Sequence, residues 1–312
     1  MRRVAERPFN GPPLAILAAA MLIAVALPAD TAALPLSLAH PKRAGCATQA
    51  PAALARAARQ NSVPSSISRS VSPILGQRGE LMGRTLSATA SDGRRITRTL
   101  PAESFVAPPT GALVLYGLHH PDAGSQILGI DTDTGCEGLL ATTDSIARSA
   151  ISDQSGDALY VHSVSSSTRA DLGVTRYRLS DGNVELVVPP LPADERFGRT
   201  FATELRWSVA EDELAVQSCG FSACRTRILE VATGAVSTID EPAQGSLVAL
   251  SDARLIAFAT CPGRPCEVLS FDRRAGDTEV VAGEALAAEV RADAEAFIVV
   301  IETTTGKVEV DL

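Results

Sequence analysis

The side chains that could do chemistry in this 312-residue chain are few and widely spaced. His119 and His120, followed by Asp122, could bind a metal ion or transfer protons, because imidazole and carboxylate groups do both. Only four histidines are present, so a metal site has few ligands to recruit. His162 falls at the end of an apolar run, where a packed interior histidine is the simpler interpretation. We therefore expect no metal site and no cofactor at these positions.

No motif of a known catalytic centre accompanies these residues. The chain contains no G-x-S-x-G elbow, no P-loop and no H-E-x-x-H sequence. The serines of residues 163–167 form a low-complexity loop without an identifiable base. Asp131 and Asp133 resemble part of a calcium loop, but an EF-hand needs a further acidic ligand and a terminal Glu, so a turn explains them better. These features predict a non-enzymatic protein, the alternative being a hydrolase or lyase, with or without a metal ion.

The elements that position these residues repeat along the chain. From about Leu81 onward, short β-rich runs alternate with turns, and a turn rich in Asp and Ser precedes an apolar strand near Ser152, Trp207, Ser251 and Arg291. A second repeated feature is a glycine in a turn. It recurs at Gly93, Gly135, Gly182, Gly234 and Gly276, with spacings of 42, 47, 52 and 42 residues. A period of about 40–50 residues with four strands per unit predicts a β-propeller, because only neighbouring blades can cover both faces of a blade.

One repeat carries a family resemblance. The stretch Trp207-Ser208, followed by Asp212-Glu213-Leu214-Ala215-Val216, resembles the W-S-P-D-G-x-x-I-A-F repeat of TolB-type, WD-like propellers. The segments at Ser152, Ser251 and Ala292 are degenerate copies, the Pro of the motif is missing, and one copy keeps the Trp. The resemblance covers residues 80–312 and implies a propeller architecture.

The repeats also predict the strand order. If the strands of a blade are A to D, the apolar run after the Asp/Ser turn is strand B, buried on both faces, at residues 113–118, 158–161, 214–217, 255–259 and 296–301. The chain starts with a C–D hairpin at residues 84–100 and ends in an A–B–C stretch at residues 286–312. Pairing of the two ends would close a ring of about five blades, or six if residues 60–80 contribute a strand. A two-sheet sandwich is the alternative.

Alternating strand direction predicts a binding surface. The B–C and D–A loops share one rim of the propeller, and the tight A–B and C–D turns share the other. The first set includes residues 119–125, 163–173, 189–200 and two cysteine-flanked loops, and long loops on a rigid scaffold are where binding residues concentrate. The partner expected there is another envelope or extracellular protein, or a small ligand. The candidate binding residues are His119, His120, Asp122, Arg169, Asp171, Asp194, Glu195, Arg196, Phe197, Phe221 and Arg264.

Six cysteines support the register of the repeats. Cys219 with Cys224, and Cys261 with Cys266, form two C-x₄-C pairs that are 42 residues apart, each in a B–C hairpin. A hairpin brings its two ends within reach of a disulfide, so we expect these two bonds. Cys46 and Cys136 remain and are available to pair with each other. Zinc is the alternative, but structural zinc sites prefer other spacings, and an exported chain favours oxidised pairs.

The N-terminus predicts export. Three arginines precede an apolar run of 16 residues, from Leu14 to Ala29, which is typical of a secretory signal peptide and is shorter than the ~20 residues that usually span a bilayer. The predicted organisation is a signal peptide or N-terminal membrane anchor (1–29), an Ala/Ser/Pro-rich linker (30–75) and a propeller (76–312). The protein would be extracytoplasmic, secreted or tethered to the outer side of the cytoplasmic membrane. A net charge of −8 argues against nucleic acid as a partner.

Overall fold

The structure is a computed structural model in which all described elements are β-strands. They belong to one compact unit, Arg43–Leu312, and the predicted signal segment lies outside the described residues. The described part of the chain contains no helix of the length and apolarity needed to cross a membrane. The structure describes residues 69–75, 81–89, 93, 95–107, 113–192, 200, 202–220, 224–241, 245–259, 266–292 and 297–312.

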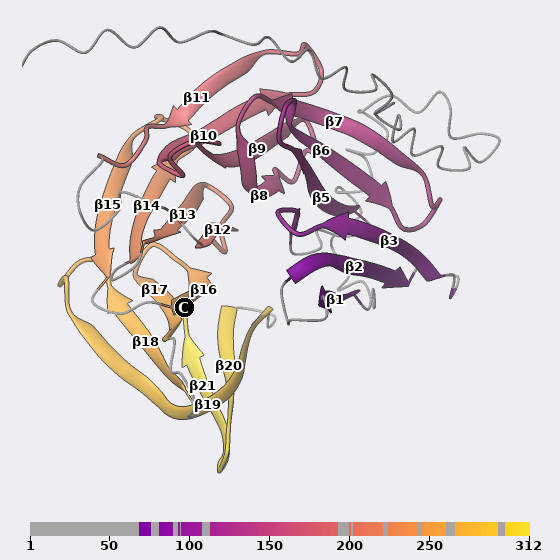
Figure 1. Ribbon diagram of the computed structural model, residues 1–312. Helices are drawn as coiled ribbons and strands as arrows, with labels where there is room; N and C mark the ends of the chain where they lie inside the picture. Colours follow the sequence, from indigo (N-terminus) through magenta and orange to yellow (C-terminus); the bar gives the residue numbers. More distant parts are fainter. Residues whose placement is uncertain are drawn as a thin grey trace, which may run out of the picture. The chain divides into compact units, whose positions relative to one another are not determined.

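Within the described residues, the strands form five antiparallel sheets that follow one another in chain order (Figure 1). The first contains β1 (Arg69–Leu75), β2 (Leu81–Thr89) and β3 (Arg95–Pro101). The second contains β4 (Phe105–Val106), β5 (Leu113–His120), β6 (Gly124–Asp131) and β7 (Glu137–Thr143). The third contains β8 (Ile146–Ser152), β9 (Ala158–Val164), β10 (Asp171–Arg178) and β11 (Val184–Val188).

The other two sheets continue the same order. The fourth contains β12 (Ala202–Trp207), β13 (Glu213–Cys219), β14 (Cys224–Glu230) and β15 (Val236–Glu241). The fifth has six strands, β16 (Gly245–Leu250), β17 (Arg254–Ala259), β18 (Cys266–Asp272), β19 (Thr278–Ala292), β20 (Phe297–Thr303) and β21 (Gly306–Asp311). Each strand pairs with its chain neighbour, so every sheet is a simple meander.

The predicted B strands are confirmed as β5, β9, β13, β17 and β20. All seven residues of β9 are buried, as are the first six of β5 and the central five of β13. This burial explains why their sequences are apolar without alternation: neighbouring sheets cover both faces of the strand.

The six-stranded sheet combines two blades through β19. Its first half pairs with β18 from Thr278 to Ala285, and its second half pairs with β20 from Ala285 to Ala292. The strand therefore ends one blade and begins the next, and the chain finishes in the predicted A–B–C stretch. At the N-terminal end of the described chain, β1 is a strand at residues 69–75. A strand from residues 60–80 is the condition under which a ring of six blades is predicted. Blade number and ring closure stay predictions.

The turn glycines adopt the left-handed conformation that the repeats require. Their φ angles lie between 70° and 80° at all five positions. At four of them the glycine N–H donates to the carbonyl four residues earlier, for example from Gly182 to Arg178 at 2.9 Å. A Cβ on Gly182 would meet no heavy atom within 4 Å, so the backbone conformation, and not crowding, favours glycine there.

The tight turns share one rim, as predicted. In three successive repeats, the residue after strand C donates a backbone hydrogen bond to the A–B turn. These bonds are Leu179 N to Asp157 O (2.6 Å), Val231 N to Asp212 O (3.0 Å) and Arg273 N to Ala253 O (2.9 Å). They join A–B and C–D turns on what we call the turn rim, so the B–C and D–A loops lie on the opposite loop rim.

Consecutive sheets pack through their first or second strands, which is the arrangement of a β-propeller. Strand β8 contacts β5 and β12, and β12 contacts β16. Figure 1 shows β8, β12 and β16 nearest the middle, with β7, β11 and β15 farther out. Trp207, the tryptophan of the repeat motif, lies between the third and fourth sheets. Its ring packs edge-on against Tyr160 at 5.2 Å, and its Nε1 donates to the carbonyl of Ser152 at 2.8 Å.

Candidate functional site

The loop rim carries a cluster of charged side chains from strands β5 and β8 and from two connecting segments, which we call the rim cluster: Glu103, His119, Arg148 and Arg169. Arg169 donates two parallel hydrogen bonds to the Glu103 carboxylate, from Nη2 to Oε1 at 2.6 Å and from Nη1 to Oε2 at 2.9 Å. The Nε2 atom of His119 lies 3.9 Å from Oε2 of Glu103. A two-point guanidinium–carboxylate pair is strong and directional. Glu103 and Arg169 are nevertheless 40% and 30% exposed, so solvent reaches them.

Local sequence explains how Arg169 reaches this position. The loop between β9 and β10 folds on Ser165, whose carbonyl accepts from the N–H of Arg169 at 3.0 Å. Arg169 has a φ of 63°, which is unusual for a residue other than glycine. The N–H of Thr200 donates to the carbonyl of Arg169 at 3.0 Å and holds the loop from the chain that leads to β12. Such strained positions concentrate at binding sites.

Positive charge exceeds negative charge in the rim cluster. Arg148 lies on β8, and its Nε is buried without a hydrogen-bond partner among the described residues. Burial lowers the pKa of Arg148, the nearby charge of Arg169 lowers it further, and Glu103 partly offsets both. Arg84 also lies within electrostatic range and donates to the carbonyl of Ser104 at 3.1 Å. Two guanidinium groups, of Arg148 and Arg169, thus lie near one carboxylate, and a third, of Arg84, lies near Arg148, in a chain whose net charge is −8.

The ionisation of the rim cluster follows from these contacts. The hydrogen bonds from Arg169 lower the pKa of Glu103, more than burial raises it, so the carboxylate is ionised at neutral pH. Burial lowers the pKa of His119, and Glu103 offsets this only in part. His119 is therefore neutral at pH 7. Its Nδ1 lies 3.2 Å from the hydroxyl of Ser125.

Two neighbours of His119 that the sequence places in the same loop lie elsewhere. Residues 119–125 form a tight hairpin and not a long loop, because His119 pairs with Ser125 and His120 with Gly124 in the β5–β6 ladder. Asp122 is exposed in the turn between these strands. Among the described residues, neither His120 nor Asp122 contacts Glu103 or Arg169, so the three residues do not form one site.

Asp171 is corrected from a rim residue to a buried one. It is 4% exposed because β10 begins with it, and its carboxylate turns toward the fourth sheet. Oδ2 accepts hydrogen bonds from Nη2 of Arg227 at 2.7 Å, the hydroxyl of Ser218 at 2.9 Å and Nε2 of His162 at 3.1 Å. Burial alone would raise the pKa of Asp171, but His162, Arg227 and Ser218 together hold it well below its usual range.

This buried network has the residue types of a serine–histidine–aspartate triad without its geometry. In a triad the histidine stands between serine and aspartate, whereas here Ser218 and His162 both contact Oδ2 of Asp171. Ser218 and His162 are each 0% exposed, so no substrate reaches the hydroxyl. Arg227 also donates to the carbonyl of Pro189. The network therefore joins the third sheet to the fourth, and the prediction that His162 is packed inside is confirmed.

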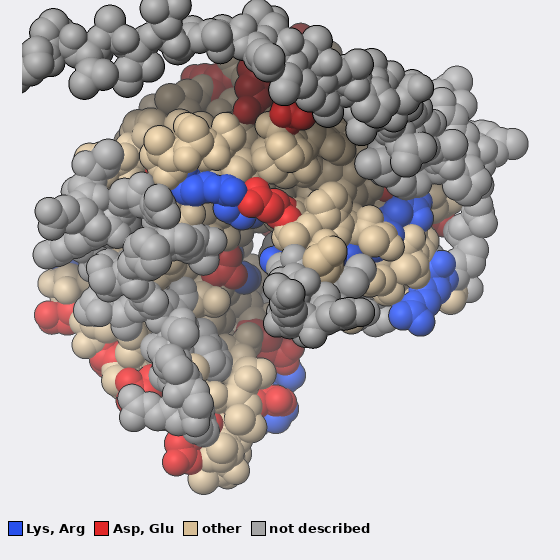
Figure 2. Space-filling view, in the orientation of Figure 1, with Lys and Arg blue, Asp and Glu red and all other residues tan. Residues whose placement is uncertain are grey.

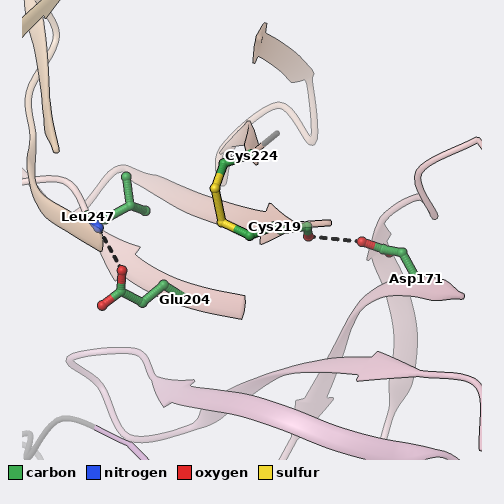
Figure 3. Close-up of a disulfide and its surroundings, with 6 residues drawn as sticks. Asp171, Glu204, Cys219, Cys224 and Leu247 are labelled. Carbon is green, nitrogen blue, oxygen red and sulfur yellow. Dashed lines mark hydrogen bonds between the residues drawn. A yellow bond between two sulfur atoms is a disulfide. The ribbon is translucent and has the colours of Figure 1, made fainter. Parts of the chain in front are cut away.

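The predicted B–C disulfide is present between Cys219 and Cys224. These residues face each other at the end of the β13–β14 ladder, with Cα atoms 4.0 Å apart (Figure 3). Cys136 is also disulfide-bonded. Cys46 and Cys261 lie outside the described residues, so the Cys46–Cys136 and Cys261–Cys266 pairings stay predictions. Asp194, Glu195, Arg196, Phe197, Phe221 and Arg264 lie outside the described residues as well.

Several charged residues near the middle of the fold were not predicted from the sequence. Glu204 on β12 accepts from the N–H of Leu247 at 2.6 Å and points to it in Figure 3; burial raises its pKa. Burial lowers the pKa of Arg206 on the same strand. Figure 2 shows basic and acidic side chains side by side near the middle of the visible face, where the surface is hollowed. The available signal was a charged residue within the short A strands, as in IARSAIS and ATELRW.

Two further features have the residue types of a site. Asp212, Glu213 and Asp252 place carboxylate oxygens within 4.8 Å of one another, but Arg273 bonds Glu213 at 2.6 and 2.8 Å and compensates its charge. A groove of about 440 Å³ runs along the β9–β10 loop. Its lining is rich in hydroxyl groups and comprises Thr143, Asp144, Ser145, Ser163, Ser165, Ser166, Leu172 and Thr175. The loop that carries Arg169 thus also borders this groove.

Comparison with solved structures finds TolB proteins and a peptidase, among others. TolB from Acinetobacter baumannii is 13% identical over 78% of this chain and 63% of its own, with a TM-score of 0.46, so the chain spans less than two thirds of that structure. A putative TolB from Agrobacterium tumefaciens is 13% identical over 69% of this chain and 81% of its own, with a TM-score of 0.42. An acylaminoacyl peptidase from Pyrococcus horikoshii is 12% identical over 76% of this chain and 41% of its own, with a TM-score of 0.45. The sequence matches no protein-family model and no curated protein. The resemblance to TolB-type propellers is a resemblance of fold, and such folds serve unrelated functions.

Proposed function

We propose that this chain is an exported, non-enzymatic β-propeller that binds a protein or a small ligand at its loop rim. The observation that carries the proposal is the rim cluster, in which a solvent-accessible Arg169–Glu103 pair lies beside Arg148, whose charge Glu103 offsets only in part. These charged side chains project from a loop and from a strand end, and two rigid sheets hold them in place. Such an arrangement is suited to the recognition of a partner or ligand.

The disulfide and the N-terminal pattern support a location outside the cytoplasm. Disulfides such as Cys219–Cys224 persist in oxidising compartments and are rare in the cytosol. The partner would be another envelope or extracellular protein, or a small ligand, and the acidic charge disfavours nucleic acid. Contact with the membrane would come only through residues 1–29, if they are retained.

An enzyme is the second candidate. A hydrolase or lyase at the mouth of the propeller requires a histidine, an acidic group and an arginine to converge, and His119, Glu103 and Arg169 do so at the loop rim. A neutral His119 could accept a proton there. Against this reading, the serine and histidine that do meet, Ser218 and His162, are inaccessible.

Crosslinking in intact producing cells, followed by affinity purification and mass spectrometry, tests the proposal. We expect one protein or ligand to be recovered repeatedly with the wild-type chain and with Arg178→Ala, and to be lost with Arg169→Ala. Arg178 is the matched control because its ion pair with Asp181 is exposed and lies by a turn of the opposite rim. Equal recovery with Arg169→Ala would refute a binding site at this rim.

The same purification separates a binding module from an enzyme. A binding module releases its partner chemically unchanged, with wild type and with His119→Asn alike. An enzyme releases a converted product with wild type and the unconverted compound with His119→Asn. Product found only with the wild type would favour the second candidate.

A further inference from the structure

We infer that the rim cluster recognises a carboxylate side chain of an acidic peptide segment, and that Glu103 occupies this position in the unbound protein. The inference rests on the proposed binding function and names the chemistry of its partner. Glu103 then acts as an internal competitor that the partner's carboxylate displaces.

Charge balance is the first argument. Arg148 lies within electrostatic range of both Arg84 and Arg169, and Glu103 supplies the acidic group within range of Arg148 and Arg169. Arg148 is half-buried, and among the described residues its guanidinium has no hydrogen-bond partner at Nε. Partly buried charges are normally paired. A carboxylate from a partner that takes the place of Glu103 on Arg169 would face the same excess of positive charge.

The geometry of the resident pair is the second argument. Arg169 holds Glu103 by two hydrogen bonds of 2.6 and 2.9 Å, which shows that the site accommodates a carboxylate in the two-point arrangement. Both side chains are partly exposed, so a carboxylate from solvent can approach. An ion pair with this exposure contributes little stability, and Glu103 can therefore be displaced at low cost.

The surroundings favour a peptide. The present occupant is itself a polypeptide carboxylate, presented from the turn between β3 and β4. The hydroxyl-lined groove beside the β9–β10 loop offers donors and acceptors for an extended main chain, among them the exposed Ser166. A segment lying in this groove would have its neighbouring side chains close to the loop that carries Arg169.

Binding of a fluorescein-labelled hexaglutamate peptide, followed by fluorescence anisotropy at low salt, tests the inference. Hexaglutamine is the uncharged control peptide. We expect hexaglutamate to bind and hexaglutamine not to bind. Arg169→Gln should weaken binding by about two- to fivefold, the value of an exposed ion pair, while Arg178→Gln leaves it unchanged.

Glu103→Gln gives the decisive result. Removal of the competing carboxylate should tighten hexaglutamate binding by about two- to fivefold, which is the equivalent of an exposed ion pair. Binding that is unchanged or weaker in Glu103→Gln would overturn the competitor role of Glu103. Thermal melting followed by circular dichroism verifies that both variants are folded, since the pair they alter is exposed.

The outcome also separates this inference from the function on which it rests. If the crosslinked partner is lost with Arg169→Ala but hexaglutamate does not bind, the binding function stands and the acidic-peptide inference is refuted. If inorganic phosphate displaces hexaglutamate as effectively as the unlabelled peptide does, the site is a general anion site and the peptide preference is refuted. If neither the partner nor the peptide depends on Arg169, both proposals fail.

Discussion

Replacement of Arg227 by methionine should destabilise the protein more than any loss of an exposed ion pair. Arg227 is 2% exposed and neutralises Asp171, which is 4% exposed and lies on the neighbouring sheet. Methionine retains much of the side-chain length but leaves the carboxylate buried without its cation. The two sheets would then face each other across an uncompensated charge.

The magnitude follows from the burial of the pair. Removal of one partner of a buried ion pair costs about 3–5 kcal/mol of unfolding free energy, because the other charge stays desolvated. Ser218, His162 and the N–H of Gly173 still donate to Asp171, at 2.9, 3.1 and 2.6 Å, which places the loss toward the lower end of that range. A cost of ~3 kcal/mol lowers the melting temperature by about 6–12 °C in a domain of about 150–250 residues.

Urea denaturation followed by tryptophan fluorescence measures this loss directly. Trp207 is the only tryptophan of the chain and lies at the same sheet–sheet contact, against Tyr160 and the carbonyl of Ser152. Arg178→Met is the control, since the pair of Arg178 with Asp181 is exposed and should cost at most about 1 kcal/mol. The double variant Asp171→Asn with Arg227→Met removes both charges and should recover part of the loss. Equal losses for Arg227→Met and Arg178→Met, or strict additivity in the double variant, would refute the buried-pair argument.

Three other predictions follow from the same structure. The pKa of Asp171 is lower in the folded than in the unfolded protein, so its contribution to stability is complete above about pH 4 and is lost as the pH falls toward the depressed folded value. Between about pH 4 and pH 2, the urea midpoint of Asp171→Asn should therefore fall less steeply than that of the wild type. A non-reduced tryptic digest should yield residues 207–225 as one peptide with Cys219 linked to Cys224, and two free thiols in that peptide would contradict the strand register. Cys219→Ser should lower the free energy of unfolding by about 2 kcal/mol, the chain-entropy value for a loop of this length. Trp207→Phe removes the hydrogen bond to Ser152 and part of the ring contact, so it should lower the free energy of unfolding by about 1–3 kcal/mol, measured by thermal unfolding. An unchanged melting temperature would count against a role of this ring between the blades.

The repeat units were predictable because each blade needs the same local features. A strand buried on both faces must be apolar, and a tight C–D turn with positive φ must carry glycine; both marks are visible in the sequence and both are confirmed. The long strand β19 was not predictable in the same way. It runs through two blades, and its change of partner falls near Ala285, next to Glu284 with a φ of 52°. Glutamate gives no sequence signal of such a bend.

The functional residues were harder to predict because their partners are distant in sequence. Arg169 was expected at the loop rim from its loop, but its partner Glu103 lies 66 residues away, in the turn between β3 and β4. Asp171 is only two residues beyond Arg169 and was placed at the same rim. The register of β10 decides the difference, because Asp171 pairs with Val164 and joins the ladder, whereas Arg169 stays in the loop.

Arg169 and Asp171 therefore show how exposure assigns roles to similar chemistry. Each belongs to a group that combines a carboxylate, a guanidinium and an imidazole: Glu103 with Arg169 and His119, and Asp171 with Arg227 and His162. In the buried group the donors converge on one carboxylate. Displacing the donors would leave that carboxylate desolvated and unpaired, so the group holds the two sheets together permanently. In the rim cluster the pair is open to solvent, costs little free energy to separate and is accompanied by Arg148, whose charge Glu103 offsets only in part. The second arrangement can exchange its carboxylate for one from a partner, and the first cannot.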